Sequence, residues 1–202
     1  MRGENEMKNL SIKTEVAGFG HVIPVLAPAN EPTDDIVTFE VEGIKDVKMY
    51  FMLVIAGKCI PLLKEILLDT NISQEELLQH LKTMEYPYIL KNFKEMTDDE
   101  ENVMGDYAFI LSSEIALYGA GAITSEYVKK QLYEKFKCNL IIVPTSKDSL
   151  LIFPEKYYSL EKNLDTFKFI VKINNSLDAE HPFLSNHLYY LDYDNKCFKT
   201  LD

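Results

Sequence analysis

The stretch that decides the fold is Asp106–Pro154, with the sequence DYAFILSSEIALYGAGAITSEYVKKQLYEKFKCNLIIVPTSKDSLLIFP. Its first apolar run, at 107–112, has the length and composition of a buried strand. Two later apolar runs, at 140–143 and 150–153, each stop at a proline and are separated by polar, turn-forming residues. This pattern predicts two further strands joined by a hairpin.

A helix is predicted between the first strand and the hairpin. Apolar residues recur every four positions from Val128 to Phe136, and charged side chains fill the other faces. Gly119-Ala-Gly121 allows a tight turn before this helix, and Thr124 or Ser125 can accept the free amide hydrogens of its first turn. The stretch therefore predicts a β-α-β-β unit.

The segments on either side extend this unit to an α+β fold with antiparallel or mixed sheets and packed helices. After the unit, we expect a helix that begins after Ser159 and ends near 174–175. A terminal hairpin of residues 188–191 and 197–200 should follow it.

The first half of the chain predicts strands followed by helices. We expect edge strands at 10–16 and 22–26 and then an antiparallel hairpin of 36–41 and 47–55. Three helices should follow: one begins at Pro61, one begins with the capping box Ser73–Glu76, in which Ser73 is the cap, and one begins near Ile89. The predicted segments are a disordered leader (1–7), a hairpin and helical lobe (8–96), an acidic connector (97–106) and a C-terminal α+β lobe (107–202).

Composition excludes several classes of function. The 202 residues carry a net charge of −11, which argues against direct, non-specific nucleic-acid binding, because such binding needs lysine and arginine to neutralise phosphates. A basic protein is the more natural partner. The three cysteines are widely spaced and form no CxxC pair, so we expect reduced thiols, a cytoplasmic location and neither a disulfide framework nor a zinc site. No apolar run is long enough to span a membrane.

Two groups of side chains are candidates for binding a partner protein. Six carboxylates within a dozen residues form either an ordinary solvated loop or a docking surface for a basic cleft; they are Glu95, Asp98, Asp99, Glu100, Glu101 and Asp106. Twelve tyrosines are many for this length, and five of them cluster toward the C-terminus, at Tyr157-Tyr158, Tyr189, Tyr190 and Tyr193, of which the last three are the partner-binding candidates. Tyrosines of this kind either serve an interface or pack on a sheet.

The sequence also offers two weaker alternatives. Gly119, Gly121, Thr124 and Ser125 could bind a phosphate or nucleotide at a helix start, but they match neither a dinucleotide fingerprint nor a Walker motif. A plain tight entry into the helix is the ordinary explanation of these residues. A hydrolase using Cys59 or Cys138 with a histidine is the third hypothesis, without a supporting motif. His181 and His187 are the best metal candidates, yet their spacing predicts no metal site, and we expect no cofactor.

The C-terminal half resembles a family of uncharacterised bacterial proteins, classed only as a domain of unknown function. The resemblance rests on these stretches: Tyr107–Leu111, Tyr118-Gly-Ala120, Val128, Glu134-Lys-Phe136, Pro144-Thr-Ser146, Leu150–Pro154 and Leu184–Tyr189. Where that family tends to carry a His-Glu pair in the hairpin, this chain has Asp148 and Ser149, which removes the one feature suited to acid-base chemistry.

The resemblance implies a setting rather than a reaction. Members of that family often travel on mobile elements of gut bacteria, which also carry small acidic proteins that block nucleic-acid defences. Taken with the charge, this implies a non-enzymatic interaction protein, of anti-CRISPR type, that binds a basic nucleic-acid-handling protein such as a CRISPR effector. The alternative is a small-ligand or nucleotide-binding module at Gly119–Gly121.

Overall fold

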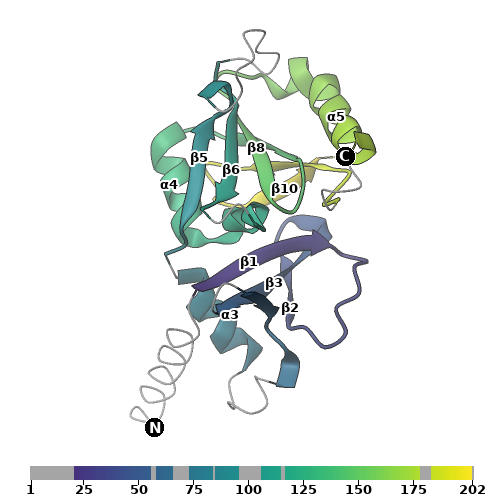
Figure 1. The fold of residues 1–202 in the computed structure, drawn as a ribbon. Helices are drawn as coiled ribbons and strands as arrows, with labels where there is room; N and C mark the ends of the chain where they lie inside the picture. Colours follow the sequence, from purple (N-terminus) through teal and green to yellow (C-terminus); the bar gives the residue numbers. More distant parts are fainter. Residues whose placement is uncertain are drawn as a thin grey trace.

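A computed structural model describes residues 21–55, 58–65, 73–83, 85–95, 106–114, 117–177 and 183–201, and it confirms the predicted α+β class. These residues form two antiparallel sheets, of four and six strands, with helices packed around them (Figure 1). The predicted leader and the strand predicted at 10–16 lie outside the described residues.

The four-stranded sheet is built along one long strand, β3 (Ile44–Ile55). β1 (His21–Pro28) pairs along one edge of β3, and β2 (Thr38–Val41) and β4 (Lys58–Pro61) pair one after the other along the opposite edge. Successive side chains of β3 from Met49 to Leu53 are all buried, so both faces of this strand are covered. The predicted hairpin of 36–41 and 47–55 is confirmed by the β2–β3 pairing.

The prediction of a helix from Pro61 was wrong at its start. Pro61 is the last residue of β4, where it pairs with Met52, and helical backbone begins at Lys64. Proline fits the end of an edge strand as well as a first helical turn, because neither place needs its missing amide hydrogen. The next prediction was right, because α3 (Gln74–Thr83) begins directly after Ser73.

The helix predicted near Ile89 was also wrong. Residues 88–92 form strand β5 (Tyr88–Asn92), and only the short 3-10 helix η1 (Phe93–Glu95) follows it. Pro87 disfavours helical backbone in the residue before it, and β5 then pairs along the free edge of β6 (Phe109–Ser113). Pairing with a distant strand therefore overrides a local pattern of apolar residues.

The β-α-β-β unit is confirmed within the six-stranded sheet, whose order is β10-β9-β7-β8-β6-β5. Helix α4 (Glu126–Phe136) connects β6 to β7 (Leu140–Pro144), and β8 (Ser149–Pro154) returns between these two strands. Strands β9 (Leu188–Leu191) and β10 (Phe198–Leu201) form the predicted terminal hairpin, and β9 pairs with β7.

Both faces of this sheet are covered, which explains the unbroken apolar runs in β7 and β8. Leu140 and Ile142 face one core together with α4, whereas Ile141 and Val143 face a second core under α5 (Leu160–Leu177). Ser125 caps α4 as predicted by accepting a hydrogen bond from the Val128 amide. Helix α5 extends past the predicted end at 174–175.

The two sheets share one core and are joined by polar contacts. The Asp46 carboxylate accepts hydrogen bonds from the buried Tyr189 hydroxyl, at 3.0 Å, and from the Ser185 hydroxyl. The Thr200 hydroxyl donates to the Gly43 carbonyl at 2.9 Å. Strand β5, which precedes the predicted connector 97–106, already belongs to the six-stranded sheet, so the chain passes between sheets before Tyr88.

Candidate interaction surface

Predicted partner-binding residues gather at one end of the six-stranded sheet. The pairings Asn92–Phe109, Phe109–Ile152 and Leu140–Leu191 place the ends of β5, β8 and β9 beside the starts of β6 and β7. These strand ends therefore lie together at one end of the sheet. The upper ends of β5 and β6 point away from the four-stranded sheet (Figure 1). We call this surface the tyrosine end and define it by Glu95, Asp106, Tyr107, Tyr157, Tyr190 and Tyr193.

Two exposed tyrosines stack on each other at the tyrosine end. The rings of Tyr107 and Tyr157 lie 3.8 Å apart and are inclined by only 10°. They are 48% and 47% exposed, although both are large and aromatic. The Tyr107 amide donates to the Tyr158 hydroxyl at 3.3 Å, and the Lys156 ammonium lies 4.9 Å from the Tyr157 ring. This side-by-side pair is a preformed aromatic surface.

One of the predicted acidic residues, Asp106, directly precedes Tyr107 of this stacked pair. Asp106, whose side chain is 67% exposed, forms an ion pair with Lys94 at 2.9 Å, and its carbonyl accepts a hydrogen bond from the Asn92 side chain. Glu95 is exposed. Asp98, Asp99, Glu100 and Glu101 lie outside the described residues.

The three C-terminal tyrosines occupy different environments. Tyr189 is 1% exposed, and burial raises the pKa of its hydroxyl, which donates to Asp46; it packs in the core and presents no surface to a partner. Tyr190 is half-buried and donates to Glu155 at 2.7 Å, and burial, followed by this hydrogen bond, raises its pKa. Tyr193 lies on the turn after β9. Alternation along β9 explains why neighbouring tyrosines point to opposite faces.

Asp192 organises the turn that carries Tyr193. Its carboxylate accepts hydrogen bonds from the Asn195 amide at 2.9 Å, the Asp194 amide at 3.0 Å and the Lys199 ammonium at 2.7 Å. These bonds, the one from the Asn195 amide first, hold the pKa of Asp192 well below its usual value.

We therefore expect replacement of Asp192 by asparagine to destabilise the protein in a pH-dependent way. Because the folded-state pKa is depressed, the carboxylate stabilises the fold above its unfolded pKa near 4, and this contribution fades as the pH falls below that value. Melting temperatures of wild type and Asp192→Asn should differ at pH 7 and converge toward pH 2. A difference that does not change with pH would contradict this role for the charge.

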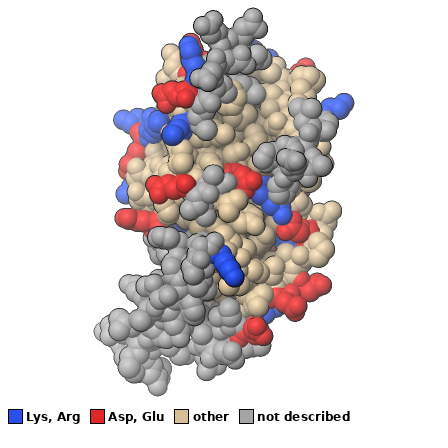
Figure 2. Space-filling view, in the orientation of Figure 1, with Lys and Arg blue, Asp and Glu red and all other residues tan. Residues whose placement is uncertain are grey.

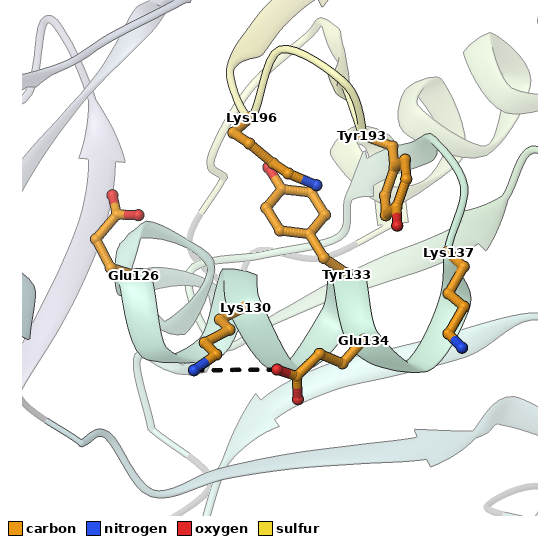
Figure 3. A pocket seen from close by; sticks show the side chains of 7 residues that line it. All are labelled: Glu126, Lys130, Tyr133, Glu134, Lys137, Tyr193 and Lys196. Carbon is orange, nitrogen blue, oxygen red and sulfur yellow. Dashed lines mark ion pairs between the residues drawn. The ribbon is translucent and has the colours of Figure 1, made fainter.

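A hollow of about 440 Å³ adjoins the tyrosine end along α4 (Figure 3). Its walls are the rings of Tyr133 and Tyr193, and the Lys196 ammonium lies between them, 4.0 Å and 3.8 Å from the ring centroids. Lys130 and Lys137 also line it. A second hollow of about 310 Å³, lined by Glu155 and Lys156, shares Tyr193. Tyr193 is therefore accessible from two sides.

The glycine motif predicted as an alternative ligand site is packed inside the protein. Gly119 to Thr124 form a buried 3-10 helix, η2 (Gly119–Thr124), and Ser125 is buried as well. A Cβ atom on Gly121 would lie 1.9 Å from the Pro24 carbonyl oxygen of β1. The Gly121 amide donates to the Tyr118 carbonyl, and the Ala120 amide donates to the Lys147 carbonyl. This geometry fits a plain tight entry into the helix, because carbonyl groups of the protein itself already accept the Ala120 and Gly121 amide hydrogens that an anion would need.

The two cysteines of the hydrolase hypothesis, Cys59 and Cys138, lie on different parts of the fold. Cys59 lies in β4 and Cys138 lies in the connection between α4 and β7, and all three cysteines are free thiols. Within the described ranges, no group of three histidine, cysteine or acidic side chains is placed to hold a metal ion. His181 lies outside those ranges. In the same part of the chain, no helix combines the length and apolar character that crossing a membrane requires.

The acidic excess is concentrated in the first half of the chain. Residues 21–114 include 18 acidic residues and 7 lysines, whereas residues 115–201 include 10 acidic residues and 11 lysines. On the face shown in Figure 2, the described acidic and basic side chains are interspersed rather than gathered by sign. A docking surface for a basic partner must therefore be local, and the segment 95–106 is its densest candidate.

Sequence reasoning missed Tyr107 as a candidate and named Tyr157 only as a member of the C-terminal tyrosine cluster. Tyr107 read as the first residue of a strand, and Tyr157 as one of an adjacent tyrosine pair, Tyr157-Tyr158. The usable signal was that each lies beside a strand end, after Gly105-Asp106 and after Pro154. Only the pairing of β6 with β8 brings the two rings together.

Comparison with known proteins identifies one family. A family model described as a family of unknown function, DUF5688, matches residues 62–194. No curated protein and no solved structure matches the chain. The matched residues include all those that define the tyrosine end.

Proposed function

The chain belongs to DUF5688, a family of unknown function whose model covers more than half of it, and from this premise we propose that it is a non-enzymatic interaction protein. It binds a basic partner protein through the tyrosine end and the acidic segment 95–106. The observation that carries this proposal is the exposed, stacked pair of Tyr107 and Tyr157 beside Asp106.

Exposed stacked tyrosines favour binding for two physical reasons. Tyrosine and arginine are enriched at the energetic centres of protein interfaces, where large rings lose contact with water. Ordering a flexible side chain on binding costs roughly 0.5–1.5 kcal/mol, and the stack has already ordered these two rings in the free protein. The pair therefore offers apolar area with little further loss of entropy.

The neighbouring carboxylates suit a basic partner. Clustered negative charge raises the association rate with a positively charged groove, and the effect weakens as salt screens it. An arginine guanidinium can stack on a tyrosine ring and pair with a carboxylate at the same time. Asp106 and Tyr107, which are neighbours in the chain, supply a carboxylate and a tyrosine ring for such a contact.

The proposed partner class is a nucleic-acid-handling protein of the cytoplasm. Its basic groove is the surface that an acidic segment can occupy, and occupation of that groove excludes the nucleic acid. In its narrowest form the protein is an anti-CRISPR-type inhibitor, encoded on a mobile element, that blocks DNA binding by a CRISPR effector. That form draws on the family resemblance in addition to the charge.

The proposal is tested by capture with a charge-neutralised control. We expect wild-type protein, immobilised at low salt, to retain a basic nucleic-acid-binding protein that Asp98→Asn/Asp99→Asn/Glu100→Gln/Glu101→Gln does not retain. The matched control is Glu40→Gln/Glu42→Gln, in β2 and the turn after it on the four-stranded sheet, which should capture the partner normally. Added DNA should then compete with wild type for the partner. Equal capture by all three proteins would show that the segment does not bind.

A further inference from the structure

We propose that the hollow against α4 is a second binding site, for a small molecule that carries a phosphate group. Its anion would be held by the ammonium groups of Lys196 and Lys137, and its apolar part would lie against the rings of Tyr133 and Tyr193. This site goes beyond the proposed protein interaction, because its ligand is small and anionic. The hollow, at about 440 Å³, is within the size range of small-ligand pockets.

The Lys196 ammonium is fixed but not neutralised. It lies between two tyrosine rings, at 4.0 Å and 3.8 Å from their centroids (Figure 3). A ring attracts a cation through its quadrupole and carries no net negative charge, so the positive charge of the lysine remains available. Among the described residues, no carboxylate pairs with this ammonium. It is therefore a positioned cation that can still pair with an anion.

The rim carboxylates are already matched by other lysines. Glu126 pairs with Lys129 at 2.5 Å, and Glu134 lies 4.0 Å from Lys130. Lys137 forms no side-chain ion pair with a described residue. The charges left over at the hollow are thus two ammonium groups, Lys137 and Lys196. Lysine is a point-charge partner for phosphate, and such charge-assisted hydrogen bonds are stronger than neutral ones.

The same two lysines share an unusual backbone conformation. Three non-glycine residues in the described ranges have positive φ, and two of them are Lys137, at 50°, and Lys196, at 55°. Glycine or asparagine is favoured at such positions, and residues held there against preference cluster at functional sites. Lys137 holds this conformation as the C-cap of α4 and Lys196 holds it at the turn before β10, so local structure accounts for both, and what the two side chains share is the hollow that they line.

A hydrogen-bond donor completes the site. The Tyr133 hydroxyl is buried and has no hydrogen-bond partner. Burial, followed by the charge of Glu126, raises the pKa of this hydroxyl to about 12, so it carries its proton at neutral pH. An unsatisfied buried donor costs free energy in the free protein; because this oxygen is sealed from solvent, a phosphate could accept from it only after the side chains around it shift.

Titration of the full chain with four probes tests the site. We expect adenosine monophosphate and phenyl phosphate to bind in calorimetry and to raise the melting temperature, inorganic phosphate to bind more weakly, and adenosine not to bind. Lys196→Met and Lys137→Met should each lower the affinity for adenosine monophosphate at least tenfold, because each removes a charge-assisted bond. Tyr133→Phe, which keeps the ring, should weaken it less.

The control is Lys162→Met on α5, which removes the same charge elsewhere and should bind adenosine monophosphate as wild type does. Equal weakening by Lys162→Met, equal binding of adenosine and its monophosphate, or no binding of any phosphate probe would overturn the proposal. Capture of a basic partner should be unchanged in Lys137→Met, because Lys137 lines the hollow but is not among the residues that define the tyrosine end.

Discussion

Replacing Gly121 with alanine is expected to lower the free energy of unfolding by about 3 kcal/mol or more. An added Cβ would lie 1.9 Å from the Pro24 carbonyl oxygen. This oxygen belongs to the backbone of β1, and the Cβ would be attached to the backbone of η2, so the clash can be relieved only by a backbone shift. Overpacking of this kind usually costs about 1–3 kcal/mol, and the cost rises when backbone rather than a side chain has to move. Urea denaturation, followed by far-UV circular dichroism, measures the change.

Two further variants show whether the contact between the sheets is responsible. Gly119→Ala should also destabilise, because its Cβ would lie 2.2 Å from the Ser113 amide nitrogen within the six-stranded sheet. Lys130→Ala, on the exposed face of α4, should change stability by less than about 0.5 kcal/mol. Since one core spans both sheets, Gly121→Ala should shift a single transition. A wild-type midpoint for Gly121→Ala would refute the close approach of η2 to β1.

Replacing both Tyr107 and Tyr157 with alanine is expected to reduce affinity for the captured partner by at least about 30-fold, which corresponds to roughly 2 kcal/mol. The rings are about half exposed, so their loss removes contact area in the complex and little packing in the free protein. Stability should therefore change by less than about 1 kcal/mol. Titration calorimetry with the purified partner measures the affinity.

The tyrosine prediction has an internal and an external control. Tyr107→Phe/Tyr157→Phe keeps the stack and should retain most of the affinity. Phe169→Ala removes the most exposed large apolar side chain of α5, at 61%, and should leave the affinity unchanged. If the double alanine variant binds as tightly as wild type, the tyrosine end is not the interface, whatever the acidic segment does.

Local sequence was sufficient for the β-α-β-β unit. The period of four from Val128 to Phe136, the Ser125 cap and the prolines that end β7 and β8 each act within a few residues, and all of them agree. Such agreement between periodicity, caps and turns is what makes a segment predictable. The terminal hairpin and the β2–β3 hairpin were predictable for the same reason, because adjacent strands need only a short turn.

Local sequence was not sufficient where a distant strand decided the structure. Residues 88–92 have an apolar pattern that suits a helix or a strand, and the free edge of β6 selects the strand. Pro61 likewise suits two structures, and the tight β3–β4 pairing, in which it lies opposite Met52, selects one. For β5 the deciding hydrogen bonds come from β6, which no short window of sequence around residues 88–92 contains.

The candidate site shows the same division. The sequence by itself determined the density of carboxylates at 95–106, the tyrosine clusters and the glycines, because composition and spacing are local properties. Only the tertiary structure decided that Tyr189 is buried against Asp46, that η2 packs against β1, and that Tyr107 meets Tyr157. The physical reason is that exposure and side-chain contact depend on which strands pair, and β6 and β8 are about forty residues apart in the chain.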